Sequence, residues 1–500
     1  MRDGEIAWMG DLDDAPAAEQ VLDLQGASVL PGLTDAHIHI FTMALSRLQV
    51  DFTASRPQSV AAVLDILRQE NARNPGADWL QGCDLNEARL AEGRMPNRRE
   101  LDEAVGDRPV LLRRYCGHVA VFNTSAMRLL GLGEHQADPQ YGHFERFDDG
   151  SLNGLAYERA AEAIFRSAPV PPAHLIRQGI RDAVADCTKL GLTSLVEAAV
   201  GFSIGYDREN EIWESLRDDD GLPVRFGFMA QLDAREAAAR GLVPSFDRRW
   251  SRETLKFFAD GIVGGRTSAL SEPFCDRGGT GTFMLAESEI EQSILDAHTA
   301  GWRVAVHATG DRAVELVAGA YERAHAGFPV DRRHRIEHCF CPSPGVFPRL
   351  RKIGAMVVTQ PSFLWRMGDS IRAGLGKRTD HAYPVRSVTD ADALLALSSD
   401  APTGLVSPWD GVRSAMDRLS SGGQVLGPRE AVTAREAIDG YIAGGALAMR
   451  HETFRGRLQP GCAADLTVLD RDPFDLAPEE VSKTRSVLTM MEGRIVHQDL

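Results

Sequence analysis

The sequence has no apolar run long enough to span a membrane, and it has no excess of positive charge. Lys and Arg number 55 against 71 Asp and Glu, which gives a formal net charge of −16 at pH 7. A surface this acidic repels phosphate backbones and anionic lipids. We therefore expect neither a nucleic-acid partner nor a membrane partner.

Cysteine pairs with zinc-finger spacing are also missing. Seven cysteines are scattered along the chain, and the closest pair, Cys339 and Cys341, is separated by one residue. An odd number without paired spacing indicates free thiols in a reducing compartment rather than a disulfide scaffold. The first residues show no basic stretch followed by an apolar one, so no secretory signal is predicted and the expected location is cytoplasmic.

The rest of the composition is that of an ordinary globular enzyme, with 43% hydrophobic and 25% charged residues. A chain of 500 residues is too long for one simple core, so a large domain with smaller modules is expected. Both ends are rich in short β runs, at 5–9, 21–24 and 28–30 and again at 456–458, 464–469 and 486–496. They predict one small β module formed by residues 1–30 and 455–500.

The long middle alternates apolar strands with helical stretches such as 289–300 and 312–326. The predicted strands are 110–112, 193–196, 224–228, 255–258, 304–306, 335–337, 355–358 and 394–397. Repeated strand–helix alternation favours an α/β fold, a (β/α)₈ TIM barrel over residues 31–454. The segment 51–150 is longer than a connection within a barrel needs, and it predicts an inserted lid.

The strongest local signal is the pair His37 and His39, which follows a Pro-Gly turn at 31–32. On an extended backbone, residues i and i+2 point the same way, so the two imidazoles can hold one metal ion. Two ordinary histidines, packed or exposed, are the alternative interpretation, and the pair alone does not decide between them.

Three further candidate ligands each follow a predicted strand. His307 ends the run 304–306, His338 ends 335–337 and Asp400 ends 394–399. Barrel enzymes place their catalytic groups at the carboxyl ends of the strands. Four imidazoles and one carboxylate suit zinc or a similar ion, and isolated histidines would not all fall at strand ends.

Lys256 lies on a predicted buried strand, where an unpaired ammonium would be costly. Desolvation lowers the pKa of a lysine, and the neutral amine can react with CO₂ to form a carbamate that bridges two metals. The alternative is a lysine paired with a carboxylate such as Asp260 or Glu197.

The order of HxH, Lys, His, His and Asp on successive strands resembles the amidohydrolase superfamily. The phrases at 258–261, 307–313, 335–338 and 399–402 are similar to its amidohydrolase 3 branch, which holds the YtcJ-like and N-substituted formamide deformylase-like proteins. The resemblance covers nearly the whole chain. It implies a barrel with a β-sandwich built from both chain ends.

The resemblance also implies the role of each site residue. His37 and His39 would bind one ion, His307 and His338 the second, and carboxylated Lys256 would bridge two Zn²⁺ ions. Asp400 would be both ligand and proton carrier. In the stretch Cys116-Gly117-His118-Val119-Ala120, His118 would reach the substrate, and Arg266 follows the lysine strand as in relatives. Either His118 or Arg266 could be catalytic, by contacting the oxyanion or the leaving group, and both could equally be structural. Glu158 would line the pocket, and Glu337 and Asp311 are candidates to orient the histidines.

These observations predict an amidohydrolase, an enzyme that cleaves a carbon–nitrogen bond of a small amide, N-acyl, N-formyl or cyclic amide substrate with a metal-activated water. Asp400 would take the proton of that water and return it to the leaving nitrogen. The alternatives are a mononuclear deaminase, an ester or lactone hydrolase, a non-catalytic binding protein and a metal-independent protein. By analogy, a homodimer is the expected assembly.

Overall fold

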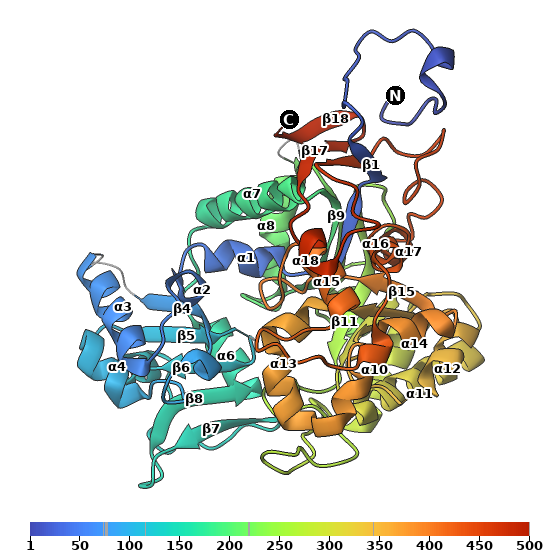
Figure 1. Ribbon diagram of the computed structural model, residues 1–500. Coiled ribbons are helices and arrows are strands. Elements are labelled where there is room, and N and C mark those ends of the chain that lie inside the picture. Colours follow the sequence, from blue (N-terminus) through green and yellow to red (C-terminus); the bar gives the residue numbers. More distant parts are fainter. Residues whose placement is uncertain (74, 76–78, 116, 219–220, 344, 500) are drawn as a thin grey trace.

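The computed structural model describes residues 1–73, 75, 79–115, 117–218, 221–343 and 345–499 (Figure 1). Cys116, which begins the stretch that contains His118, lies outside the described residues, as do residues 74 and 76–78 of the predicted lid and residue 500 of the predicted terminal module. Within the described part of the chain, no helix is both long and apolar enough to cross a bilayer.

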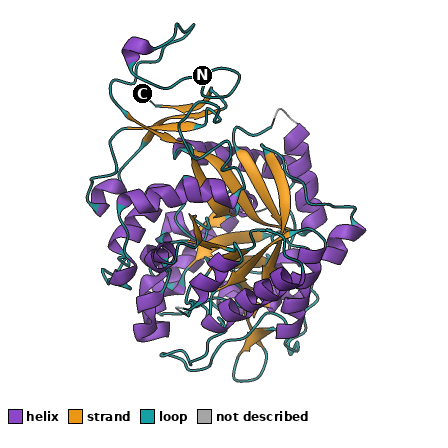
Figure 2. Cartoon of the chain, turned by 90° about the vertical axis from the view of Figure 1, so that its right-hand side faces the viewer, coloured by secondary structure: helices purple, strands orange, loops and turns teal. Residues whose placement is uncertain are grey.

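An eight-stranded parallel sheet curls into a nearly closed barrel (Figure 2). Its strands, in pairing order, are β15 (Leu394–Leu397), β14 (Met356–Thr359), β13 (Arg335–His338), β12 (Arg303–Ala308), β11 (Trp250–Phe258), β10 (Arg225–Ala230), β9 (Leu192–Val200) and β2 (Leu33–Ile38). Just past β15, the Asp400 N–H donates to the His37 carbonyl at 2.8 Å, and the His39 N–H donates to the Ala401 carbonyl at 2.9 Å. These bonds link the two ends of the sheet at the carboxyl ends of its strands.

Helices surround the barrel (Figure 2), and the apolar faces of most of them share one core with the outward faces of the strands, whereas the helices at 362–375 and 443–448 pack in two other apolar clusters. They are α1 (Ile40–Ser46), α7 (Ala173–Lys189), α8 (Tyr206–Asp218), α9 (Ala234–Ala239), α10 (Glu287–Thr299), α11 (Asp311–Gly327), α12 (Val346–Lys352), α13 (Ser362–Leu375), α14 (Val385–Asp390), α15 (Pro408–Asp417), α16 (Ala434–Tyr441) and α17 (Ala443–Ala448). Short 3-10 turns are η3 (Gly376–His381) and η4 (Pro428–Glu430). The (β/α)₈ barrel is confirmed.

A second, six-stranded sheet is inserted between β2 and β9 and lies beside the barrel (Figure 1, left). Its elements are β3 (Val50–Asp51), α2 (Phe52–Ser55), α3 (Val60–Arg73), β4 (Leu80–Leu85), η2 (Glu87–Arg89), α4 (Arg98–Val105), β5 (Val110–Arg114), β6 (Val119–Phe122), α5 (Thr124–Leu129), β7 (Gly142–Arg146), β8 (Leu152–Glu158) and α6 (Arg159–Ser167). The strand predicted at 110–112 belongs to this sheet and not to the barrel, because β5 pairs with β4 and β6.

The two chain ends meet in a four-stranded antiparallel sheet above the barrel (Figure 1, top). It contains β1 (Ser28–Pro31), β16 (Leu466–Leu469), β17 (Ser486–Met491) and β18 (Arg494–Gln498), with η1 (Leu12–Asp14) and α18 (Pro478–Val481) nearby in sequence. A sandwich was expected here. The described residues of the two chain ends instead form this single sheet and isolated bridges at Glu5. The strands predicted at 21–24 and 456–458 are wrong. Val21 is 85% exposed, so burial does not offset the entropy cost of ordering that segment.

Candidate metal centre

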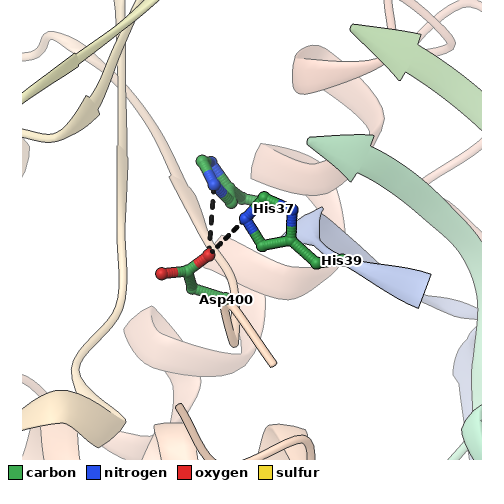
Figure 3. A group of neighbouring side chains, drawn as sticks. All are labelled: His37, His39 and Asp400. Carbon is green, nitrogen blue, oxygen red and sulfur yellow. Dashed lines mark ion pairs between the residues drawn. The ribbon is translucent and has the colours of Figure 1, made fainter. Parts of the chain in front are cut away.

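His37, His39 and Asp400 meet at the carboxyl end of the barrel (Figure 3). The Asp400 Oδ1 atom lies 3.2 Å from His37 Nε2 and 3.1 Å from His39 Nε2. His37 and Asp400 are buried, and the His39 side chain is 15% exposed. The structure therefore brings the two ends of the barrel sheet together through three residues that can all bind a metal ion.

Local backbone irregularities aim these side chains inward. The pairing of β2 with β9 changes register between Asp35 and Ile38, which is the segment that presents His37. Asp400 has a φ of +53°, which a residue with a side chain rarely adopts. Irregular strand ends and positive φ values of this kind concentrate at functional sites, where they re-aim a side chain.

His307 and His338 lie next to this cluster. The ring centre of His338 is 5.0 Å from that of His37 and 4.5 Å from that of His307. Along β13, Ile336 packs in the outer core, so strict alternation would also turn His338 outward. The φ of +70° at His338 reverses this direction and turns its ring to the mouth of the barrel.

Lys256 reaches the same cavity from β11 and is only 1% exposed. Burial lowers its pKa to about 8, although Glu337 and Asp400 act in the opposite direction. The two carboxylates considered as its partners are engaged elsewhere. Asp260 accepts the backbone N–H groups of Ala269, Thr309 and Gly310, and Glu197 accepts that of Phe41.

Hydrogen bonds to the second ring nitrogen set the orientation of three histidines. Glu337 accepts from His37 Nδ1, and Gln360 Oε1 lies 2.8 Å from His338 Nδ1. His307 Nε2 lies 2.9 Å from the carbonyl of Gly261. In a neutral imidazole, each contact leaves the other ring nitrogen as a lone pair, which is the form that binds a metal.

Of the two orienting residues suggested by the sequence, only Glu337 touches a histidine. Asp311 instead accepts the backbone N–H of Ser271 at 2.9 Å. Gln360 was missed by the sequence reasoning, although its position directly after β14, at the carboxyl end of a strand, was an available signal.

The atoms present fit a cation between His37, His39 and Asp400. The Oδ1 atom of Asp400 is buried without a hydrogen-bond donor. When His37 and His39 are neutral and their Nε2 atoms carry no proton, as for His37 when Nδ1 donates to Glu337, neither ring can be that donor. A buried acceptor facing lone pairs is unfavourable by itself, and a divalent ion resolves the conflict.

A cavity extends from this cluster to solvent. Its walls are mostly apolar and aromatic, and include Phe202, Phe258, Phe340, Phe363, Met367 and Tyr383. His118 lines it from the insertion, and its Nδ1 is 2.7 Å from Glu158 Oε2. Burial alone would lower the pKa of His118, but the charge and hydrogen bond of Glu158, together with the charges of Asp400 and Glu162, outweigh burial and raise it.

Arg266 is not among the residues that line this cavity. Its guanidinium Nε is 2.9 Å from Asp276 Oδ1, and its other nitrogens donate to the carbonyls of Val263 at 2.7 Å and Ser370 at 3.0 Å. These contacts tie the loop after β11 to α13. The structure thus brings His118 to the other candidate residues and leaves Arg266 outside the group.

The barrel and its histidine–carboxylate cluster define an α/β-barrel protein with a candidate metal site, and the relatives of the chain narrow this class. The amidohydrolase family matches residues 20–497, and the chain belongs to this family. The protein YtcJ of Bacillus subtilis (strain 168) is 28% identical over 521 residues, covering 100% of this chain and 95% of its own. N-substituted formamide deformylase of Arthrobacter pascens is 28% identical over 515 residues, covering 98% and 93%.

A solved structure of an uncharacterized metal-dependent hydrolase from Pyrococcus horikoshii OT3 superposes with a TM-score of 0.75 at 24% identity. The match covers 96% of this chain and 94% of the other, and it supports the fold. Membership of the family confirms the resemblance noted in the sequence, and it confirms that the chain is an enzyme, a hydrolase of carbon–nitrogen bonds.

Proposed function

We propose that this enzyme hydrolyses an amide, N-acyl, N-formyl or cyclic amide bond of a small molecule at a centre of two Zn²⁺ ions. The observation that carries the proposal is the buried Asp400 Oδ1 atom, which faces two imidazole nitrogens and has no hydrogen-bond donor. The relative named N-substituted formamide deformylase supports a substrate with an amide-type bond.

Six residues would hold the metal. His37, His39 and Asp400 would hold one ion, and His307 and His338 would hold the other. Lys256, carboxylated on Nζ, would be a ligand of both. The burial of Lys256 and its pKa of about 8 support this assignment, because a neutral amine fraction is available near neutral pH to react with CO₂.

When bound, the ions would lower the pKa of a water molecule and polarise the scissile carbonyl. Asp400 accepts the proton of that water and returns it to the leaving nitrogen. His118, held by Glu158, donates a hydrogen bond to the substrate oxygen. The aromatic walls of the cavity exclude bulk water and hold the apolar part of the substrate.

We assign the barrel to residues 31–454 and the terminal module to residues 1–30 and 455–500, with the inserted segment that begins at residue 51 as a lid. The lid assignment is supported by Asp84, Tyr115 and His118, three residues of the insertion that line the cavity. Arg266 supports the site only indirectly, by tying the loop that follows β11 to α13.

The test is the zinc content per chain of freshly purified protein, with an intact-mass measurement under native conditions because acid releases CO₂ from a carbamate. We expect close to two zinc ions and one CO₂ adduct that is absent from Lys256→Ala. His37→Ala should lose zinc, whereas His174→Ala, a change at an exposed histidine, should not.

One ion without the adduct would favour a mononuclear centre with deaminase chemistry. Two ions together with cleavage of esters or lactones, but not of amides, would favour an ester or lactone hydrolase. Absence of metal after reconstitution with zinc would refute the proposal. Gel filtration tests the expected homodimer, and a panel of N-acyl and N-formyl compounds then identifies the substrate.

A further inference from the structure

An ion pair lies inside the barrel below the candidate metal centre. Arg335 and Glu337 are two residues apart on β13, so both point inward, and their side chains are 1% and 0% exposed. Arg335 Nε donates to Glu337 Oε1 at 2.6 Å, and Nη2 donates to Oε2 at 2.9 Å. Buried charges are costly, and this bidentate geometry is the arrangement that best offsets the cost.

The pair touches His37 at two points. Glu337 Oε2 accepts the hydrogen bond from His37 Nδ1. Arg335 Nη2 also donates to the carbonyl of Ala36, the residue before His37, at 2.7 Å. One guanidinium therefore fixes both the peptide that carries the ring and the carboxylate that orients it.

We propose that Arg335 and Glu337 are a positioning pair that fixes the ring orientation and the Nδ1–H tautomer of His37 before the metal binds. The inference rests on the proposed function, because it concerns the affinity of the same centre. Arg335 holds the Glu337 carboxylate in place through two hydrogen bonds, and that carboxylate accepts the hydrogen bond from His37 Nδ1. His37 Nε2 is then a lone pair aimed toward Asp400. Changes to such orienting partners typically cost about 10- to 100-fold in metal affinity.

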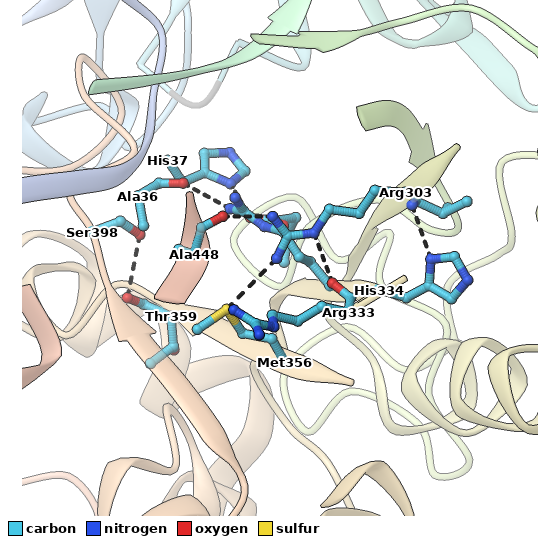
Figure 4. A network of polar contacts seen from close by, with 12 residues as sticks. Ala36, His37, Arg303, Arg333, His334, Met356, Thr359, Ser398 and Ala448 are labelled. Atoms are coloured by element: carbon cyan, nitrogen blue, oxygen red, sulfur yellow. Dashed lines mark hydrogen bonds and ion pairs between the residues drawn. The ribbon is translucent and has the colours of Figure 1, made fainter. Parts of the chain in front are cut away.

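Arg303 provides a matched control. It is a second buried arginine of the barrel interior, 2% exposed. Figure 4 shows its guanidinium bound to the carbonyls of Arg333 and Ala448, at 2.7 Å and 2.5 Å. These contacts lead to neighbouring backbone and not to a candidate metal ligand. Loss of Arg303 should therefore lower stability without changing the metal centre.

The experiment measures the Zn²⁺ affinity of the full chain by competition with a chromophoric chelator. The affinity compared between variants is that of the zinc ion that is lost in His37→Ala. We expect Glu337→Gln and Arg335→Met to weaken this affinity by about 10- to 100-fold. Arg335→Lys, which keeps the charge, should lie between Arg335→Met and the wild type. Arg303→Met should bind zinc as the wild type does, even where its unfolding temperature is lower.

A second readout needs no metal. Nitrogen-15 spectra of histidine in the metal-free protein should show His37 in the Nδ1–H form in the wild type and as a mixture of tautomers in Glu337→Gln. Glu337→Gln is nearly isosteric and Arg335→Lys is conservative, so the test stands if Arg335→Met fails to fold. Unchanged zinc affinity in folded Glu337→Gln and Arg335→Lys would overturn the positioning role of the pair and leave the proposed function standing. A wild type that binds no zinc would overturn it together with the proposed function.

Discussion

An ion pair joins the insertion to the barrel beside the candidate centre. Arg366 of α13 donates from Nη2 to Asp84 Oδ1 at 2.7 Å, and the two side chains are 11% and 12% exposed. Arg366 Nη1 also donates to the carbonyl of Pro402 at 2.6 Å, two residues after Asp400. If the insertion is a lid, this contact, which we call the clasp, holds it over the cavity.

The clasp gives a prediction with a magnitude. A hydrogen bond between charged groups contributes about 1.5–3 kcal/mol, and 1.4 kcal/mol corresponds to a factor of ten. Asp84→Asn should therefore raise KM by roughly 10- to 100-fold and change kcat by less than about 3-fold. Arg366→Met should raise KM equally and also lower kcat, because it releases the loop that carries Asp400.

The assay is steady-state hydrolysis of the best amide from the substrate panel, for both single variants and the double variant. In the double variant the two effects on KM should not add, since both remove one contact. The control is Arg372→Met. Arg372 lies on the same helix as Arg366, and its guanidinium donates to the carbonyl of Val425 at 3.1 Å. An unchanged KM in Asp84→Asn, or strictly additive effects, would refute the clasp.

Three further predictions concern single groups. Asp400→Asn should lower kcat by about 10²- to 10⁴-fold, the contribution usual for acid–base catalysis, in a protein that circular dichroism shows to be folded; an active variant would refute its proton-carrying role. Glu158→Gln removes the charge that raises the pKa of His118, so the alkaline limb of the kcat/KM profile should move to lower pH; an unmoved limb would remove His118 as donor. His298 Nδ1 and His334 Nε2 lie 2.8 Å apart, and burial lowers the pKa of both below the unfolded value of about 6.5. Their contribution to stability is therefore present above that pH and is lost as the pH falls. Denaturant unfolding at pH 7.5 and 5.5 should show a smaller loss in the double variant His298→Gln/His334→Gln than in the wild type, and an equal loss would contradict this reading.

Much of the barrel could be read from local pattern. Apolar runs separated by helical stretches are dictated by burial, so seven of the eight barrel strands, β9 to β15, were found near their true positions, and β2 was not among the predicted barrel strands. Lys256 and His307, which the sequence placed on a buried strand and at a strand end, both line the cavity.

Other features follow from contacts between distant segments, which no local pattern contains. The run at 110–112 has the composition of a barrel strand but pairs within the insertion, and the strand predicted at 21–24 finds no partner among the described residues. Glu337 lies 300 positions from His37 in sequence, yet it touches its ring. Arg266 lies close to Lys256 in sequence, yet its charge is satisfied by Asp276.

The sequence by itself therefore determined the fold class and which residue types stand at the strand ends, because burial and alternation act over a few residues. Only the tertiary structure decided which way the ends of those strands turn. The positive φ values of His338 and Asp400 are rarely adopted by residues with side chains, and they persist because the surrounding packing fixes them. Those two turns bring His338 and Asp400 to His37, and they create the site.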